Sequence, residues 1–293
     1  MSSGIAYRCT LPDPAFESAW DSIKMDKAVK DRLVAQATLA LTVRRAVSFD
    51  VAPLHGLIVL AGVPGTGKTT LARGLATKVA AMLSPSKVNF IQVDPHGLAS
   101  ASLGKSQQQV TTLFNQTIPE AGMGGFAVVL LDEVETLAAD RKKMSLEANP
   151  VDVHRATDAV LASLDLLTRQ HKNILLIATT NYPQAVDSAF LSRADLIEYI
   201  PPPNNEARAE IIRDTLEGLG RQWPSIRNLA NDMSLFVAAS SGMDGRRLRK
   251  AVVSALAGSI ATARDPNLVT SQQVLAALKA STQANKEVGR EAA

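Results

Sequence analysis

The strongest constraint on what this chain can fold into is one short match to the pattern G-x-x-x-x-G-K-[ST], made by Gly62-Val63-Pro64-Gly65-Thr66-Gly67-Lys68-Thr69. It lies between an aliphatic run at 57–61, which predicts a buried strand, and a helical pattern over 68–83. Glycines in such a turn let backbone N–H groups converge on phosphate oxygens, and the positive end of the following helix favours the same anion. Lys68 adds a charge for the β- and γ-phosphates, and Thr69 offers a hydroxyl to Mg²⁺. We therefore predict a nucleotide cradle formed by Gly62, Val63, Pro64, Gly65, Thr66, Gly67, Lys68, Thr69 and Thr70.

A pair of acids directly follows another predicted strand, at 127–131. Asp132 is predicted to hold the water shell of Mg²⁺ together with Thr69, and Glu133 to polarise a water for attack on the γ-phosphate. A kinase with this loop does not need a water-activating glutamate, whereas an ATP hydrolase does. The chain has no N-K-x-D motif for reading guanine. The pair therefore favours hydrolysis of ATP with Mg²⁺ as the metal.

Strand and helix patterns alternate along the first two thirds of the chain. Short aliphatic runs predict five buried strands, at 57–61, 88–93, 127–131, 174–178 and 196–200. This alternation predicts an α/β fold with a doubly wound, five-stranded parallel sheet. After the triple proline at 201–203 only helical patterns remain, which predicts a small α-helical lid domain. We expect a flexible arm at 1–19, the α/β domain at 20–203, the lid at 204–282 and a frayed tail at 283–293.

Composition removes several classes of protein. The chain has 31 Lys and Arg against 28 Asp and Glu, and only 4% aromatic residues, so it lacks both a strongly basic tail and rings for base stacking. One cysteine, Cys9, excludes an intrachain disulfide, and the four histidines lack the spacing of zinc ligands. The longest apolar runs fall far short of the about 18 residues of a membrane span, and the first residues do not read as a secretory signal. We expect a cytoplasmic protein with no membrane partner.

Further segments resemble the AAA+ ATPases, in the order in which that superfamily carries them. Asn181, at the end of the fourth predicted strand, resembles the polar sensor that orients the attacking water. Arg193, within Asp-Ser-Ala-Phe-Leu-Ser-Arg-Ala-Asp, resembles the arginine finger that reaches a neighbouring subunit's γ-phosphate. Arg246 resembles the lid arginine nearest the nucleotide. The resemblance spans about residues 20–278 and implies a homohexamer, since a finger of this kind cannot reach its own nucleotide.

Within that superfamily, the chain resembles the pachytene-checkpoint type, the hexameric remodellers of HORMA-domain proteins. The segments behind this resemblance are Ala19-Trp20-Asp21-Ser22-Ile23 with Val29-Lys30, Asn149 through Arg155, Phe190 through Leu196, and Gly245-Arg246 with Leu248-Arg249-Lys250. Only 19 residues precede Trp20, as in the short bacterial members that accompany HORMA proteins and nucleotide-second-messenger synthases in antiphage (CBASS) systems. The resemblance therefore implies a HORMA-domain protein as substrate, with such a synthase as a further partner. The family's pore loop usually presents an aromatic, but the corresponding stretch at 100–105 has none, which implies a weaker grip on substrate.

Other interpretations stay open at this point. A nucleic-acid AAA+ protein, such as a clamp-loader or initiator subunit, would need a basic strip with aromatics. The clusters at 141–143 and Arg44-Arg45 are short and lack neighbouring aromatics in the sequence, which predicts solvated faces and no direct nucleic-acid ligand. The remaining alternatives are another protein unfoldase and a nucleotide-gated binding module without productive hydrolysis.

Overall fold

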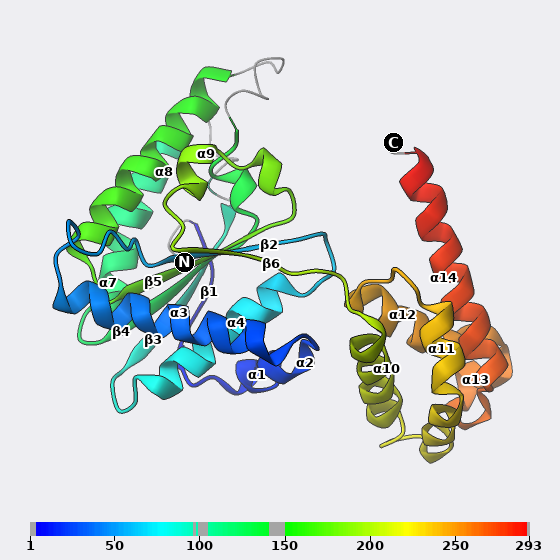
Figure 1. Ribbon diagram of the computed structural model, residues 1–293. Helices are drawn as coiled ribbons and strands as arrows, with labels where there is room; N and C mark the ends of the chain where they lie inside the picture. The colour runs from blue at the N-terminus through cyan, green and yellow to red at the C-terminus, as the bar shows by residue number, and fades with distance from the viewer. Residues whose placement is uncertain (1–3, 96–97, 99–104, 141–149, 292–293) are drawn as a thin grey trace. The chain divides into compact units, whose positions relative to one another are not determined.

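The computed structural model describes residues 4–95, 98, 105–140 and 150–291 (Figure 1). The chain forms two compact units: Met1–Val63 with Lys68–Ile200, and Pro64–Gly67 with Pro201–Ala293. Within the described residues, no helix combines the length and apolar character that crossing a membrane requires.

A six-stranded sheet organises the first unit, in the order β1-β3-β4-β5-β2-β6. All neighbouring strands are parallel except the pair β1–β3. The strands are β1 (Ile5–Leu11), β2 (Leu57–Ala61), β3 (Val88–Val93), β4 (Phe126–Leu131), β5 (Ile174–Thr180) and β6 (Leu196–Tyr199). The predicted doubly wound α/β fold is confirmed, with one strand more than the five expected.

The sixth strand comes from residues that were expected to form a flexible arm. Ile5–Leu11 pairs antiparallel with β3 at the edge of the sheet, and the short helices α1 (Pro14–Glu17) and α2 (Ala19–Ser22) follow it. Most residues of β1 are exposed or half-buried, so the segment lacks the continuous apolar run that marks a central strand. Phe16 closes this edge of the core, with its ring edge-on to Phe90 at 4.9 Å.

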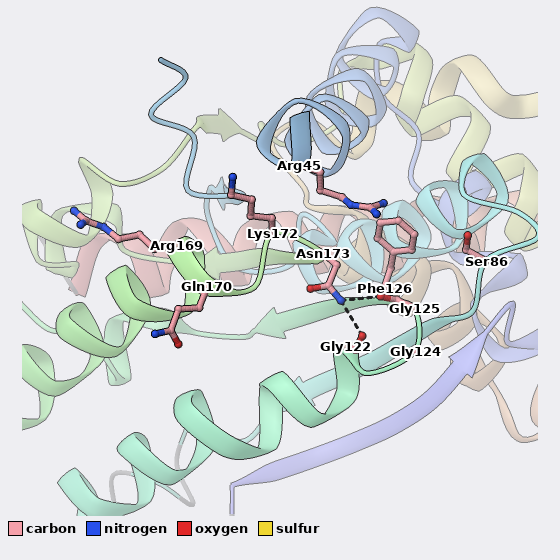
Figure 2. A pocket seen from close by; sticks show the side chains of 10 residues that line it. All are labelled: Arg45, Ser86, Gly122, Gly124, Gly125, Phe126, Arg169, Gln170, Lys172 and Asn173. Atoms are coloured by element: carbon pink, nitrogen blue, oxygen red, sulfur yellow. Dashed lines mark hydrogen bonds between the residues drawn. The ribbon is translucent and has the colours of Figure 1, made fainter. Parts of the chain in front are cut away.

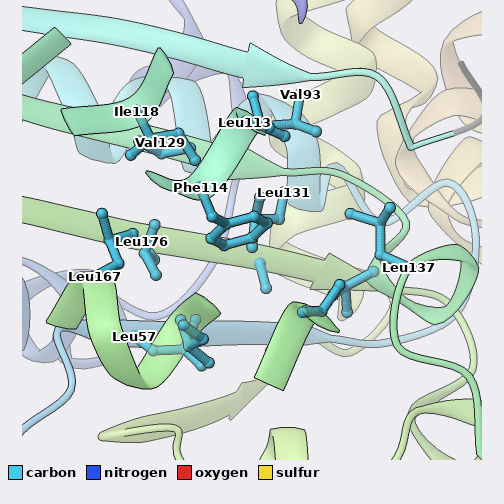
Figure 3. Packing of buried hydrophobic residues seen from close by; sticks show 14 of the residues in the cluster. Leu57, Val93, Leu113, Phe114, Ile118, Val129, Leu131, Leu137, Leu167 and Leu176 are labelled. Atoms are coloured by element: carbon cyan, nitrogen blue, oxygen red, sulfur yellow. The ribbon is translucent and has the colours of Figure 1, made fainter. Parts of the chain in front are cut away.

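Helices cover both faces of the sheet and complete two separate cores (Figure 1). The helices of this unit are α3 (Lys27–Ala46), α4 (Lys68–Met82), α6 (Lys105–Thr112), α7 (Ile118–Gly122), α8 (Pro150–Gln170) and α9 (Ser188–Leu191). Because side chains alternate along a strand, Ile58 packs with α3 and α4, whereas Leu57 packs with α6 and α8. Figure 3 shows part of the core that contains Leu57, between the sheet and helices α6 and α8, with the fully buried ring of Phe114 at its centre.

The second unit is helical, as predicted. Its helices are α10 (Asn205–Leu219), α11 (Met233–Ala239), α12 (Gly245–Ser254), α13 (Ile260–Arg264) and α14 (Ser271–Glu291). They bury a core of their own that includes Ile212, Phe236 and Leu278. We expected the chain to fray from residue 283, but in the structure α14 continues to Glu291. Proline is absent from this stretch and most of its residues favour a helix, so nothing local ends α14 earlier.

Arg44 is not on a solvated face, contrary to the sequence-based prediction. Its side chain is buried and joins α3 to the start of β5: Nη1 donates to the carbonyl of Ile174 at 2.8 Å, and Nη2 to that of Thr168 at 2.9 Å. Burial lowers the pKa of the Arg44 guanidinium to about 10. Gly56 leaves the space for it, since a Cβ there, at a φ of +70°, would lie 1.8 Å from Nη1.

We expect Gly56→Ala to lower the free energy of unfolding by about 2–4 kcal/mol. A positive φ costs an alanine about 1 kcal/mol, and the methyl group must also push the guanidinium away from two buried carbonyls. Gly124→Ala is the matched control, because Gly124 has a φ of +74° but, apart from its two chain neighbours, no described residue has a heavy atom within 4 Å of the place that a Cβ would take. The control should lose about 1 kcal/mol in urea unfolding. Equal losses in the two variants would mean that Arg44 can move without cost.

Candidate nucleotide site

The phosphate loop connects β2 to α4 at the carboxyl end of the parallel strands, where open α/β sheets bind ligands. Gly62 has a φ of +150°, and a Cβ there would lie 2.4 Å from the carbonyl oxygen of Ile200, so no side chain fits. Lys68 begins α4 and is buried. Its Nζ donates to the carbonyls of Gly62 at 2.8 Å and Val63 at 3.0 Å, which folds the ammonium back over the loop.

The two predicted metal ligands are in direct contact. Thr69 Oγ1 donates to Asp132 Oδ1 at 2.8 Å, across 63 residues of sequence. The hydroxyl of Thr179, near the end of β5, donates to the same oxygen at 2.5 Å, and Gln92 Nε2 on β3 donates to Oδ2 at 3.3 Å. A hydroxyl and a carboxylate are the hard oxygen ligands that Mg²⁺ prefers, and few protein ligands suffice where phosphates supply the rest. The residues present therefore fit a Mg²⁺–triphosphate group.

Glu133 has a backbone conformation that is unusual for its residue type. Its φ is +52°, the one positive value for a non-glycine residue in the described part of the chain. The hydroxyl of Thr179 accepts its N–H at 3.1 Å. Asn181 Nδ2 donates to Glu133 Oε1 at 3.4 Å, and the N–H of Asn181 donates to Glu135 Oε1 at 3.1 Å. Strain of this kind clusters at functional sites. Here the strained residue is the predicted base, and it lies beside the predicted sensor at the ends of the neighbouring strands β4 and β5.

Sequence reasoning missed the residues that support Asp132. Gln92 and Thr179 lie near the ends of buried strands and hold the two carboxylate oxygens. Arg73 on α4 extends the network, because its Nη2 donates to Gln92 Oε1 at 2.6 Å. A polar side chain near the carboxyl end of an otherwise apolar strand was the available signal.

Two predicted arginines are not among these residues. Arg193 forms an ion pair with Asp165 of α8 in the same chain, and its Nε donates to Asp165 Oδ1 at 2.6 Å. Arg246 belongs to the second unit, in the first turn of α12, where its N–H donates to Asp244 Oδ1 at 3.0 Å. The pore-loop stretch at 100–104, the cluster at 141–143 and Asn149 lie outside the described residues.

A separate pocket of about 590 Å³ opens where β4 and β5 begin (Figure 2). It is lined by three cations, Arg45, Arg169 and Lys172, and by Ser86, Gly122, Gly124, Gly125, Phe126, Gln170 and Asn173. Asn173 Nδ2 closes its wall by donating to two glycine carbonyls. The guanidinium of Arg45 lies 5.2 Å from the centre of the Phe126 ring, so this arginine has an aromatic neighbour that the sequence alone did not reveal. Strands β4 and β5 reach the predicted nucleotide residues at their other ends, so this pocket is not the phosphate site.

Comparisons with known proteins define the class. Residues 58–202 match the family described as ATPase family associated with various cellular activities (AAA). The chain belongs to the AAA ATPase family and is therefore a nucleotide-binding ATPase. It is 47% identical over 293 residues to CD-NTase-associated protein 6 of Pseudomonas aeruginosa, covering 99% of this chain and 96% of that protein.

The pachytene-checkpoint resemblance is confirmed by a second relative. The pachytene checkpoint protein 2 homolog of Homo sapiens is 34% identical over 272 residues. This match covers 84% of the chain but only 62% of the human protein.

Solved structures share the fold. One is a chain of the E. coli MS115-1 HORMA:CdnC:Trip13 complex, with a TM-score of 0.76 and 20% identity over 94% of this chain and 95% of that one. Another is C. elegans PCH-2, with a TM-score of 0.75 and 22% identity over 96% of this chain and 75% of that one.

Proposed function

We propose that this chain is a Mg²⁺-dependent, hexameric ATP hydrolase that opens HORMA-domain proteins in the bacterial cytoplasm. The observation that carries the proposal is the 47% identity to CD-NTase-associated protein 6 along almost the whole length of both chains. The HORMA protein and a nucleotide-second-messenger synthase are the proposed partners, in keeping with the HORMA:CdnC:Trip13 complex whose ATPase shares this fold.

The arrangement around Asp132 supports hydrolysis over passive nucleotide binding. Lys68, whose ammonium donates to carbonyls of the loop in this structure, would bind the β- and γ-phosphates. Thr69 and Asp132 would hold Mg²⁺, which would neutralise charge on the phosphates. Glu133 would accept a proton from the attacking water, because its carboxylate is exposed at the strand end and its backbone is held by Thr179. A binding module would have no use for this second carboxylate.

Assembly into a ring would complete each site with a residue from the next subunit. Arg193 is the proposed finger, and Arg246 of the lid is proposed to respond to the phosphates of its own subunit. Hydrolysis at subunit boundaries would then drive the relative motion that pulls on substrate.

The proposal is tested with a HORMA protein that holds a fluorescent peptide. We expect the wild-type protein with Mg²⁺ and ATP to release the peptide, which lowers its fluorescence anisotropy, and we expect the Glu133→Gln variant not to do so. A non-hydrolysable ATP analogue is the second control. Sustained ATP hydrolysis without peptide release would reject HORMA opening, and ATPase stimulation by DNA would favour the clamp-loader alternative.

A further inference from the structure

The guanidinium of Arg193 is held along one edge. Nε donates to Asp165 Oδ1 at 2.6 Å and Nη2 to Asp165 Oδ2 at 2.8 Å, while Nη1 donates to the carbonyl of Ala189 at 2.6 Å. A guanidinium carries five N–H groups in one plane. A carboxylate bound by Nε and Nη2 occupies the side edge, and a carbonyl of the same helical turn occupies the inner edge of Nη1. Among the residues that the structure describes, the other two N–H groups, one on each Nη, have no protein partner and form a fork at the outer end of the side chain.

Both partners of Arg193 are themselves fixed in place. Asp165 follows Leu164, which is fully buried in the core beneath α8. Ala189 belongs to α9, where its N–H donates to the side chain of the N-cap residue Asp187 at 2.8 Å. The short loop after α9 is anchored beyond Arg193 as well, because Asp195 accepts the N–H groups of residues 55 and 56 at 2.7 and 2.6 Å. The backbone that carries Arg193 therefore has little freedom to move.

At neutral pH the carboxylate of Asp165 is ionised and its main charged partner is Arg193. The hydrogen bond from Arg193 holds the pKa of Asp165 below its ordinary value, so the group stays ionised at neutral pH. His55 Nε2 lies 3.9 Å from Asp165, but burial lowers the pKa of His55, which keeps the imidazole neutral near pH 7. The positive charge of Arg169, one turn further along α8, also lowers the pKa of Asp165, but by less than Arg193 does.

The pair contributes orientation more than stability. The side chain of Arg193 is 23% exposed and that of Asp165 is 37% exposed, and ion pairs with this much solvent contribute only about 0–1 kcal/mol to folding. A bidentate contact nevertheless selects one rotamer of a long, flexible side chain. The free fork then has the geometry with which guanidinium groups bind two oxygens of a phosphate.

We propose that Asp165 is a positioning residue that orients Arg193 so that its outward fork meets the γ-phosphate held by the neighbouring subunit. This inference rests on the proposed function, in which Arg193 acts across the subunit boundary. Asp165 touches no nucleotide and acts only through Arg193. Without the carboxylate, the guanidinium samples other rotamers, and the alignment needed in the transition state is lost.

Asp165→Asn tests the proposal with a near-isosteric change. We expect kcat for ATP hydrolysis to fall about 10- to 100-fold, with KM for ATP within about twofold of wild type and an unchanged ATP-dependent ring on size-exclusion chromatography. Asp158→Asn removes an exposed carboxylate two turns earlier on the same helix and should keep the wild-type kcat. Asp165→Glu returns the carboxylate one methylene further out and should recover part of the loss.

Mixed rings separate positioning of the finger from a purely structural role. Glu133→Gln subunits have a disabled site but an intact finger, whereas Asp165→Asn subunits have an intact site and a misaligned finger. Mixing the two should raise turnover per Asp165→Asn subunit at least several-fold above that of Asp165→Asn rings, because some sites receive an intact finger. If Asp165 acts only within its own subunit, mixing restores nothing, and the inference is overturned.

Arg193→Ala subunits mixed with Glu133→Gln subunits provide the reference. If this reference pair regains turnover while Asp165→Asn alone keeps the wild-type kcat, the positioning role is wrong and the finger stands. If the reference pair regains nothing, or Arg193→Ala alone retains full turnover, the trans finger of the proposed function is wrong, and the positioning role falls with it.

Discussion

Arg193→Ala is expected to lower kcat for ATP hydrolysis by about 10³- to 10⁵-fold, while the Kd for ATP changes little. In the proposed mechanism Arg193 supplies positive charge to the phosphoryl oxygens as negative charge develops in the transition state, so it would contribute far more to lowering the barrier than to binding ATP. Phosphate release at saturating ATP measures the first quantity, and calorimetric titration with a non-hydrolysable analogue measures the second.

The expected loss is not a folding defect. Removing Arg193 breaks a half-exposed ion pair with Asp165, which is worth at most about 1 kcal/mol. The melting temperature should therefore stay close to that of wild type. Arg213→Ala, which removes an exposed arginine from α10, is the matched control and should retain full activity. Turnover within threefold of wild type in Arg193→Ala would show that this arginine is not the finger.

Glu133→Gln has the second largest expected effect, a fall in kcat of about 10²- to 10⁴-fold. Glutamine keeps the shape of the side chain and an oxygen that can accept from Asn181, but it cannot take a proton from water. The proposed binding groups Lys68 and Thr69 are unchanged in this variant, so ATP should stay bound. We expect a stable ATP-loaded ring that elutes early from a sizing column and retains unhydrolysed nucleotide.

Glu120→Gln is the control for this variant, since it makes the same chemical change at an exposed position of α7. It should hydrolyse ATP like wild type and should not trap the ring. Hydrolysis by Glu133→Gln within tenfold of the wild-type rate would contradict the assignment of Glu133 as the base.

The phosphate loop and the acid pair were predictable because each is formed by residues that are consecutive in the sequence. The phosphate loop joins one strand to one helix, so its glycines and Lys68 stand in a row, and Asp132 and Glu133 follow their strand directly. Parallel strands place their carboxyl ends along one edge of a sheet, so the strand pattern also indicated that the acids would approach the loop. The contact between Thr69 and Asp132 follows from that topology.

Contacts between distant segments were not predictable from patterns. The edge strand Ile5–Leu11 was missed because it lacks the continuous apolar run by which the central strands were recognised. Its apolar residues only alternate with polar or small ones over seven positions, and its place is set by pairing with β3. Arg44 was expected in solvent because a basic pair usually is, and only the packing of Gly56 against it explains its burial. Gln92 was not recognised either, since its role depends on the neighbouring strand.

The amino-acid sequence by itself determined the α/β class, the helical second unit, the phosphate loop and the acids that directly follow β4. Each of these depends on residue type and spacing within a few turns or one strand, where sterics and burial act locally. Only the tertiary structure decided which side chains support Asp132, how Glu133 is held, and that Asp165 grips Arg193 along one edge. These are contacts between segments 28 to 47 residues apart, and they exist only once the buried strands and helices have fixed the positions of both partners.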